Sequence, residues 1–122
     1  MYLIDSDFLI DFLKNKKETV SLISSLNSGE LHVSIVSVGE ILEGVPQKEI
    51  KKYLKFFSNF IIINIDIPII IKFAEIRREL RKKGKLLDNF DLLIASTCLS
   101  RNLKLITGNK KHFNRINGLK IA

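Results

Sequence analysis

The chain opens with MYLIDSDFLIDFL (residues 1–13). Residues 2–4 form a short, unbroken apolar run, which is typical of a buried strand. After Asp5, the apolar residues at positions 8, 9, 12 and 13 fall on one face of a helix. This stretch therefore predicts a strand that passes directly into a helix, with an acidic residue at the junction.

The same alternation of strand and helix recurs to the end of the chain. Short apolar runs predict strands at 31–35, 60–63 and 103–106, and 119–122 is a candidate fifth strand. Helical spacing predicts helices at 20–26, 50–57, 69–80 and 88–101, and the Ser37-x-x-Glu40 form of a capping box predicts another from Ser37 to about residue 45. Short apolar strands alternating with helices are typical of a parallel sheet with helices on both faces. We expect an α/β fold, in a single domain over residues 1–122.

The charge balance favours a polyanion as partner. Twenty Lys and Arg residues against thirteen Asp and Glu residues leave a net charge of +7. Such a balance is common in proteins that bind nucleic acid. The residues that we expect to contact the phosphates of such a polyanion are Arg81, Lys82, Lys83, Lys110 and Lys111. A solvated helix face is the alternative interpretation of such a basic cluster.

The single cysteine, Cys98, excludes an internal disulfide and, with two histidines, is too little for a Cys/His zinc site. This composition favours a reducing, cytoplasmic location. The first residues carry an acid and no basic start, so we do not expect a signal peptide. The most apolar region, 56–76, is interrupted by Asn64, Asp66, Pro68 and Lys72, so we do not expect a membrane span.

Several acidic residues are expected at one edge of the predicted sheet. Ligands of open parallel α/β sheets bind beyond the carboxyl ends of the strands. Asp5 follows the first strand, and Asn109 follows the fourth. The helices that carry Glu40 and Asp91 should begin at loops near the same edge.

Each of these acids also has a structural interpretation. Asp5 could cap the following helix, and Glu40 is the third residue after Ser37 in a capping box. Asp7 is a first-turn acid, which the helix dipole favours. Asp88 suits the N-cap position of the predicted helix at 88–101, and Asp91, three residues later, could complete that cap. Asp91 lies among apolar neighbours, where an ionised carboxylate needs either such a cap or a bound cation.

Converging carboxylates repel one another and raise one another's pKa unless a cation neutralises them. Oxygen ligands select hard ions such as Mg²⁺ or Mn²⁺. Such ions can bind a phosphate oxygen, activate water and stabilise the leaving oxygen of a phosphodiester. The sequence contains no Gly-rich phosphate loop, no GxGxxG and no Gly-x-Ser-x-Gly, so other common chemistries lack support.

Four segments resemble a known family in order and spacing. They are MYLIDSDFLI at 1–10, SVGEILEG at 37–44, DNFDLLIAS at 88–96 and LITGNKKHF at 105–113. Together they resemble the PIN-domain ribonucleases, in particular the VapC toxins of toxin–antitoxin systems. The resemblance implies a parallel sheet flanked by helices and endoribonuclease activity that depends on Mg²⁺ or Mn²⁺. It also implies a VapB-like antitoxin that inserts a segment into the active-site groove, and a homodimer.

Carried over by the same motifs, the catalytic and metal-binding acids of the family fall on Asp5, Glu40 and Asp91. A fourth family position, often Asp, is Asn109 here, and Asp88 is a candidate to supply the missing charge. Two alternatives remain: a housekeeping PIN nuclease for RNA processing, and an inactive PIN-like module that binds RNA or protein. The retained acids argue against the inactive module.

Overall fold

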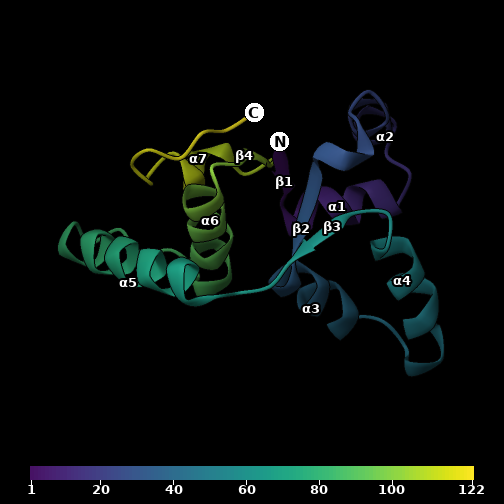
Figure 1. Ribbon diagram of the computed structural model, residues 1–122, viewed down its shortest axis with the longest axis horizontal. Helices are drawn as coiled ribbons and strands as arrows, with labels where there is room; N and C mark the ends of the chain where they lie inside the picture. The colour runs from purple at the N-terminus through teal and green to yellow at the C-terminus, as the bar shows by residue number, and fades with distance from the viewer.

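A computed structural model describes residues 1–122, with the exception of the Ser28 side chain. The strands are β1 (Tyr2–Ile4), β2 (Leu31–Ser34), β3 (Ile61–Ile63) and β4 (Lys104–Ile106). The helices are α1 (Ser6–Leu13), α2 (Lys17–Ser24), α3 (Ile35–Glu43), α4 (Ile50–Phe57), α5 (Ile67–Lys82), α6 (Asn89–Arg101) and α7 (Lys110–Phe113), with short 3-10 helices at Ser28–Glu30 and Gln47–Glu49. The predicted α/β alternation is confirmed (Figure 1).

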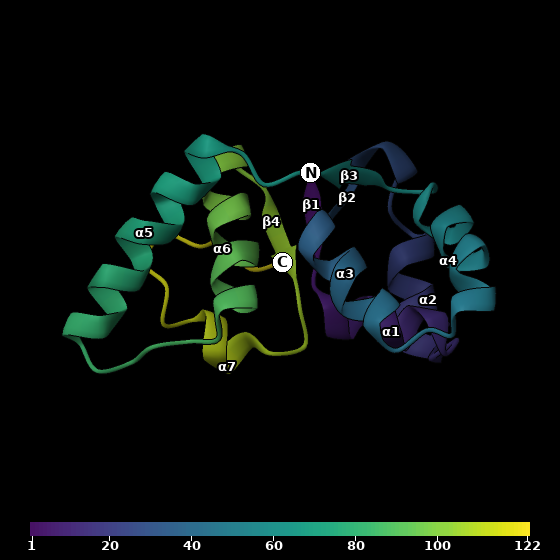
Figure 2. The same cartoon turned by 90° about the horizontal axis from the view of Figure 1, so that it is seen from below.

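In the part of the chain that the structure describes, the four strands form one parallel sheet in the order β3-β2-β1-β4. Leu3 of β1 is aligned with His32 of β2 on one side and with Leu105 of β4 on the other. Figure 2 shows α5 and α6 on one side of the sheet and α1, α2, α3 and α4 on the other. The central strand β1 is therefore enclosed on both faces and both edges, which explains its unbroken apolar sequence.

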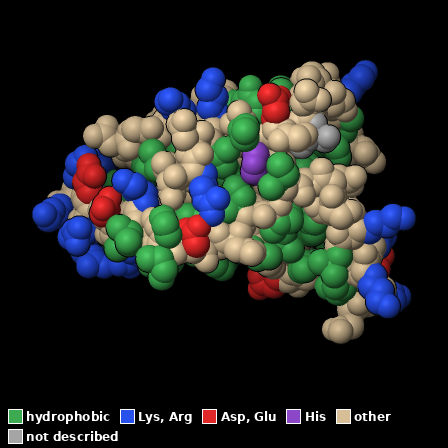
Figure 3. Space-filling view, in the orientation of Figure 1, with side chains coloured by type: hydrophobic (Ala, Val, Ile, Leu, Met, Phe, Trp, Pro, Cys, Tyr) green, Lys and Arg blue, Asp and Glu red, His purple; other side chains and the backbone are tan. Residues whose placement is uncertain are grey.

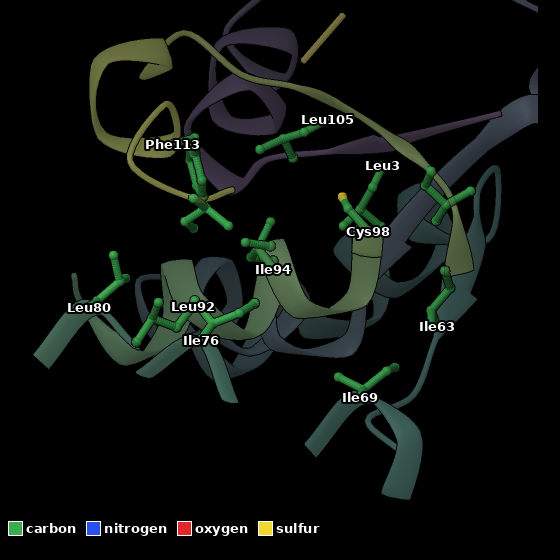
Figure 4. Packing of buried hydrophobic residues seen from close by; sticks show 13 residues of the cluster. Leu3, Ile63, Ile69, Ile76, Leu80, Leu92, Ile94, Cys98, Leu105 and Phe113 are labelled. Atoms are coloured by element: carbon green, nitrogen blue, oxygen red, sulfur yellow. The ribbon is translucent and has the colours of Figure 1, made fainter. Parts of the chain in front are cut away.

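Two hydrophobic cores lie on the two faces of the sheet. Because successive strand residues point to opposite faces, Leu3 enters the core under α5 and α6, whereas Ile4 enters the core under α1, α3 and α4. Figure 4 shows the first core, where Leu92 and Ile94 of α6 lie between the sheet and α5. Cys98 is buried in that core, as its apolar surroundings in the sequence suggest. This packing fixes the position of α6 on the sheet.

The candidate fifth strand at 119–122 is not a strand. Ile121 makes a single parallel bridge to Leu105, supported by hydrogen bonds of 2.9 Å from Leu105 N to Lys120 O and from Ala122 N to Leu105 O. Leu119 and Ile121 instead pack against the core under α6. The apolar residues in this segment therefore reflect burial more than pairing.

The predicted start of the third helix is wrong. Helix α3 begins at Ile35, and the Ser34 hydroxyl caps it by accepting a hydrogen bond of 3.1 Å from Val36 N. The chain passes from β2 into α3 without a loop, so the last residue of the strand serves as the cap. Ser37 is therefore a buried residue within the helix, and Glu40 has no part in a capping box.

Other helix termini agree with the sequence. Pro68 lies in the first turn of α5, and Gly84, with φ +64°, follows its end. Asp88 is the N-cap of α6, as predicted. In the described part of the chain, no helix is both long and apolar enough to cross a membrane.

Candidate active site

The strand order brings the polar strand ends together at one edge of the sheet. Because β1 lies between β2 and β4, the residues that follow these three strands are neighbours. Strands β2 and β3 lie on one side of β1, and β4 lies on its other side. The strand order therefore reverses between β1 and β4, which is the topological switch point of the sheet. Asp5 N donates a hydrogen bond of 2.9 Å to Ile106 O across that boundary. Asp5 therefore lies at the position where α/β sheets bind ligands.

Asp5 is buried, with 4% of its surface exposed. It is the N-cap of α1, and its Oδ1 accepts a hydrogen bond of 2.8 Å from Ser6 N. Its Oδ2 accepts one of 2.8 Å from the Thr107 hydroxyl at the end of β4. Burial raises the pKa of Asp5, and the hydrogen bonds from Thr107 and Ser6 oppose that rise. The capping interpretation is thus correct, and it does not exclude a role in a site.

Glu40 lies on α3, half-buried, and reaches the β1–α1 junction. The Ser6 hydroxyl donates a hydrogen bond of 2.7 Å to Glu40 Oε1. Burial raises the pKa of Glu40, the bond from Ser6 lowers it, and the negative charges of Asp5, Asp88 and Asp7 raise it further. Its carboxylate is thus directed toward the β1–α1 junction rather than toward its own helix end.

Asp91 lies in the first turn of α6, half-buried. Asp88 caps this helix by accepting a hydrogen bond of 3.1 Å from Phe90 N, so Asp91 does not supply the cap. Burial raises the pKa of Asp91 to about 6, with further contributions from Asp5, Asp88 and Glu40. The helix start is less enclosed than the sequence suggests, because Phe90 is 46% exposed.

Asn109 and the exposed acids complete the rim. Asn109 N donates a hydrogen bond of 2.9 Å to the Thr107 hydroxyl, which itself donates to Asp5. The Asn109 side-chain amide lies 2.9 Å from His112 Nδ1. Asp88 and Asp7 are exposed and act on the other acids through their charge.

Three residues of this site were missed in the sequence: Ser6, Ser37 and Thr107. Ser6 and Thr107 join the carboxylates to the sheet edge, and Ser37 contacts Ser6 at 2.8 Å. The available signal was position, since Ser6 and Thr107 are polar residues at the junctions that follow β1 and β4.

The oxygen-rich site fits a hard divalent cation. Asp5, Glu40 and Asp91 interact through their charges, and the pKa of each is raised. Among the described residues, no group of three or more His, Cys, Asp or Glu side chains is already arranged to hold an ion. Mg²⁺ does not need such a cage, because it keeps several waters and binds directly to one or two carboxylates. The carboxylates with raised pKa are the residues that could hold it.

Replacing Asp91 with Asn should stabilise the protein in the presence of a chelator. A folded pKa of about 6 against the ordinary value of 3.8 for an aspartate means that ionised Asp91 opposes folding. The penalty is absent well below pH 3.8, still small at pH 4, grows as the pH rises toward 6, and is complete above it. After allowance for the exposed half of the side chain, we expect about 1 kcal/mol, or roughly 3–6 °C in Tm, at pH 7.5.

Thermal unfolding at pH 4 and pH 7.5 measures this difference. Asp11→Asn is a matched control, because Asp11 lies on α1 and pairs with Lys16 at 3.1 Å outside the cluster. Added Mn²⁺ should raise the Tm of the wild type more than that of Asp91→Asn. An equal Tm for Asp91→Asn and wild type at pH 7.5 would show that neither burial nor the neighbouring charges make ionised Asp91 oppose folding.

A parallel α/β sheet with polar residues and carboxylates at its switch point defines a class of α/β protein that binds its ligand at this edge. Within that class, residues 2–119 match the PIN domain family. The chain is 39% identical over 122 residues to Ribonuclease VapC1 of Methanocaldococcus jannaschii, an alignment that covers 98% of this chain and 85% of that protein. The chain therefore belongs to the PIN-domain family, and the predicted resemblance to VapC toxins is confirmed.

Another relative and two solved structures point to the same family. The chain is 28% identical to the tRNA(fMet)-specific endonuclease VapC of Shigella flexneri, over 98% of this chain and 94% of that protein. Its fold matches the crystal structure of DNA-bound VapBC from Salmonella typhimurium with a TM-score of 0.90 and 28% identity, over 99% of this chain and 96% of that one. VapBC2 from Rickettsia felis, bound to a promoter DNA fragment, matches with a TM-score of 0.87 and 25% identity.

Proposed function

We propose that this protein is an endoribonuclease that depends on Mg²⁺ or Mn²⁺ and acts as the toxin of a toxin–antitoxin pair. The observation that carries the proposal is the convergence of Asp5, Glu40 and Asp91, each with a raised pKa, at the switch point of a VapC-type PIN fold. Full-length similarity to ribonucleases supports the same activity. A cytoplasmic location and a homodimer stay predictions.

In this proposal each acid has a physical role. Asp5, held by Thr107 and Ser6, is the rigid ligand at the sheet edge, and Glu40 and Asp91 approach it from α3 and α6. A bound Mg²⁺ or Mn²⁺ would supply a Lewis acid for a phosphate oxygen and a water of lowered pKa. Asp88 and Asn109 are secondary ligand candidates at the rim.

Purified protein incubated with total RNA tests this proposal. Cleavage is expected with Mn²⁺ or Mg²⁺ and should disappear when a chelator is present in excess, because the carboxylates alone repel the phosphate. Restoring the metal should restore cleavage. Full cleavage in excess chelator would contradict the metal mechanism, and RNA binding without cleavage would favour the inactive module.

The basic surface is expected to hold the RNA backbone. Arg77 of α5 donates a hydrogen bond of 3.2 Å to Asn89 at the start of α6, the end that carries Asp91. Arg81, Lys82 and Lys83 lie about one turn further along the chain, at the C-terminal end of α5. Figure 3 shows Lys and Arg side chains gathered at this end of the molecule, on the left of the view. Lys83 also pairs with Glu79 at 3.1 Å, which leaves Arg81 and Lys82 as better phosphate contacts. Lys110 and Lys111 begin α7 directly after Asn109.

Replacing Arg81 and Lys82 together with Gln should weaken RNA binding and its salt dependence. For single strands the slope of log affinity against log salt is about −0.7 per neutralised phosphate, so two lost contacts should reduce it by about 1.4. The cleavage position should not change, because phosphate contacts carry no sequence information. Affinity measured across salt concentrations tests this, with Lys51→Gln/Lys55→Gln on the distant α4 as control. An equal loss of slope in both double variants would contradict a local contact.

A further inference from the structure

Ser6 contacts two of the three central acids through different atoms. Its backbone N–H donates to Asp5 Oδ1 at 2.8 Å, and its hydroxyl donates to Glu40 Oε1 at 2.7 Å. Asp5 belongs to the β1–α1 junction, whereas Glu40 is on α3, 34 residues beyond Ser6. Ser6 is therefore the residue that joins these carboxylates.

Ser37 extends this hydrogen-bond chain, and Glu40 determines its direction. Its hydroxyl oxygen lies 2.8 Å from Ser6 Oγ, and its side chain is fully buried. A serine hydroxyl has one proton to donate. An ionised Glu40 can only accept, so the Ser6 proton goes to Glu40 and the Ser37 hydroxyl donates to Ser6. Ser37 lies one turn before Glu40 on α3, so the chain closes on the helix that carries the acid.

We propose that Ser6 and Ser37 form a clamp that positions Glu40 against Asp5 for metal binding. The clamp is defined as the chain of hydrogen bonds from the Ser37 hydroxyl to the Ser6 hydroxyl to Glu40 Oε1, together with the Ser6 N–H bond to Asp5. Ser6 and Ser37 are positioning residues that do not themselves bind the ion. The clamp opposes the repulsion that would drive the two carboxylates apart before an ion arrives. This inference rests on the proposed function only in assuming that the bound ion is a divalent metal.

The clamp makes distinct predictions for three variants. Ser6→Ala removes the donor to Glu40 and should weaken Mn²⁺ binding about ten-fold or more, as loss of an outer-shell partner commonly does. Ser37→Ala leaves Ser6 in place and should weaken it about five-fold, equivalent to one neutral hydrogen bond. Ser6→Thr keeps the hydroxyl and should restore affinity close to that of the wild type.

Ser96→Ala is the matched control. Ser96 is also a fully buried helical serine, but its hydroxyl donates to the Leu92 carbonyl of its own helix. If the loss of any buried hydroxyl weakened Mn²⁺ binding, Ser96→Ala and Ser37→Ala would therefore lower the Mn²⁺ affinity equally. The clamp predicts that Mn²⁺ affinity changes only in Ser37→Ala.

Isothermal titration of each variant with Mn²⁺ alone, together with crystal structures of the metal-free proteins, tests the clamp. We expect weakened binding in Ser6→Ala and Ser37→Ala, and a displaced Glu40 carboxylate in Ser6→Ala. Wild-type affinity in both variants with an unmoved Glu40 would overturn the proposal. If Ser6→Ala does not fold, the comparison of Ser37→Ala with Ser96→Ala decides. If the wild type binds no Mn²⁺, the metal-dependent function fails, whereas the position of Glu40 in the variant structures still decides whether the clamp exists.

Discussion

Asp5→Asn, Glu40→Gln and Asp91→Asn should each remove most RNA cleavage. The substitutions keep the shape of the side chain and remove the charge that would hold a cation. We expect losses larger than the roughly 10–100-fold that follows replacement of an outer-shell partner of a metal ligand. Asp5→Asn should have the largest effect, because Asp5 is the most buried of the three and is held by donors on both oxygens.

The measurement is the initial rate of RNA cleavage at saturating Mn²⁺, with circular dichroism to check the fold. Asp11→Asn serves again as control, because this acid lies on α1 and pairs with Lys16 away from the cluster. Wild-type rates of RNA cleavage in all three folded variants would show that the three acids have only a structural role. Such a result would contradict catalysis at the acidic cluster.

A cognate antitoxin should suppress cleavage completely at saturation. The solved structures that resemble this chain include VapBC complexes, and the acidic cluster offers a partner a site for Arg or Lys in place of the metal. Charge-assisted hydrogen bonds to carboxylates are strong. Asp91→Asn should therefore weaken antitoxin binding about ten-fold or more when measured in chelator.

Mn²⁺ and antitoxin should then compete, so added Mn²⁺ should weaken antitoxin binding to the wild type more than to Asp91→Asn. Titration of the antitoxin into each protein, with and without Mn²⁺, measures this competition. Unchanged affinity in Asp91→Asn together with full cleavage in the saturated complex would contradict inhibition at the acidic site. It would favour a housekeeping nuclease.

Local patterns in the sequence were enough to predict most of the helices and strands and to single out the candidate acidic residues. The apolar run before Asp5 and the helical spacing after it depend on neighbouring residues, and both were predicted correctly. Asp88 as an N-cap and Pro68 in a first turn follow from the same kind of local chemistry. The motifs that carry Asp5, Glu40 and Asp91 also sufficed to suggest the family that the comparisons confirm.

Local patterns misled where two interpretations fit the same residues. Ser37-x-x-Glu40 has the form of a capping box, but Ser34 precedes it and caps α3 as β2 ends. Residues 119–122 have the composition of a strand, yet they make one bridge. In the first case a neighbouring residue caps the helix instead, and in the second burial against the core accounts for the apolar residues. A motif considered alone includes neither effect.

Only the tertiary structure decided how the site is joined. Asp5 and Thr107 are separated by 102 residues, and Ser6 and Glu40 by 34, yet each pair is hydrogen-bonded. These contacts exist because β1 lies between β2 and β4. Apolar runs predict that strands are parallel and buried, but strand order depends on how all the helices pack on the two faces at once. The sequence by itself therefore determined which side chains are candidates for the chemistry, and the packing of distant segments decided which of them touch.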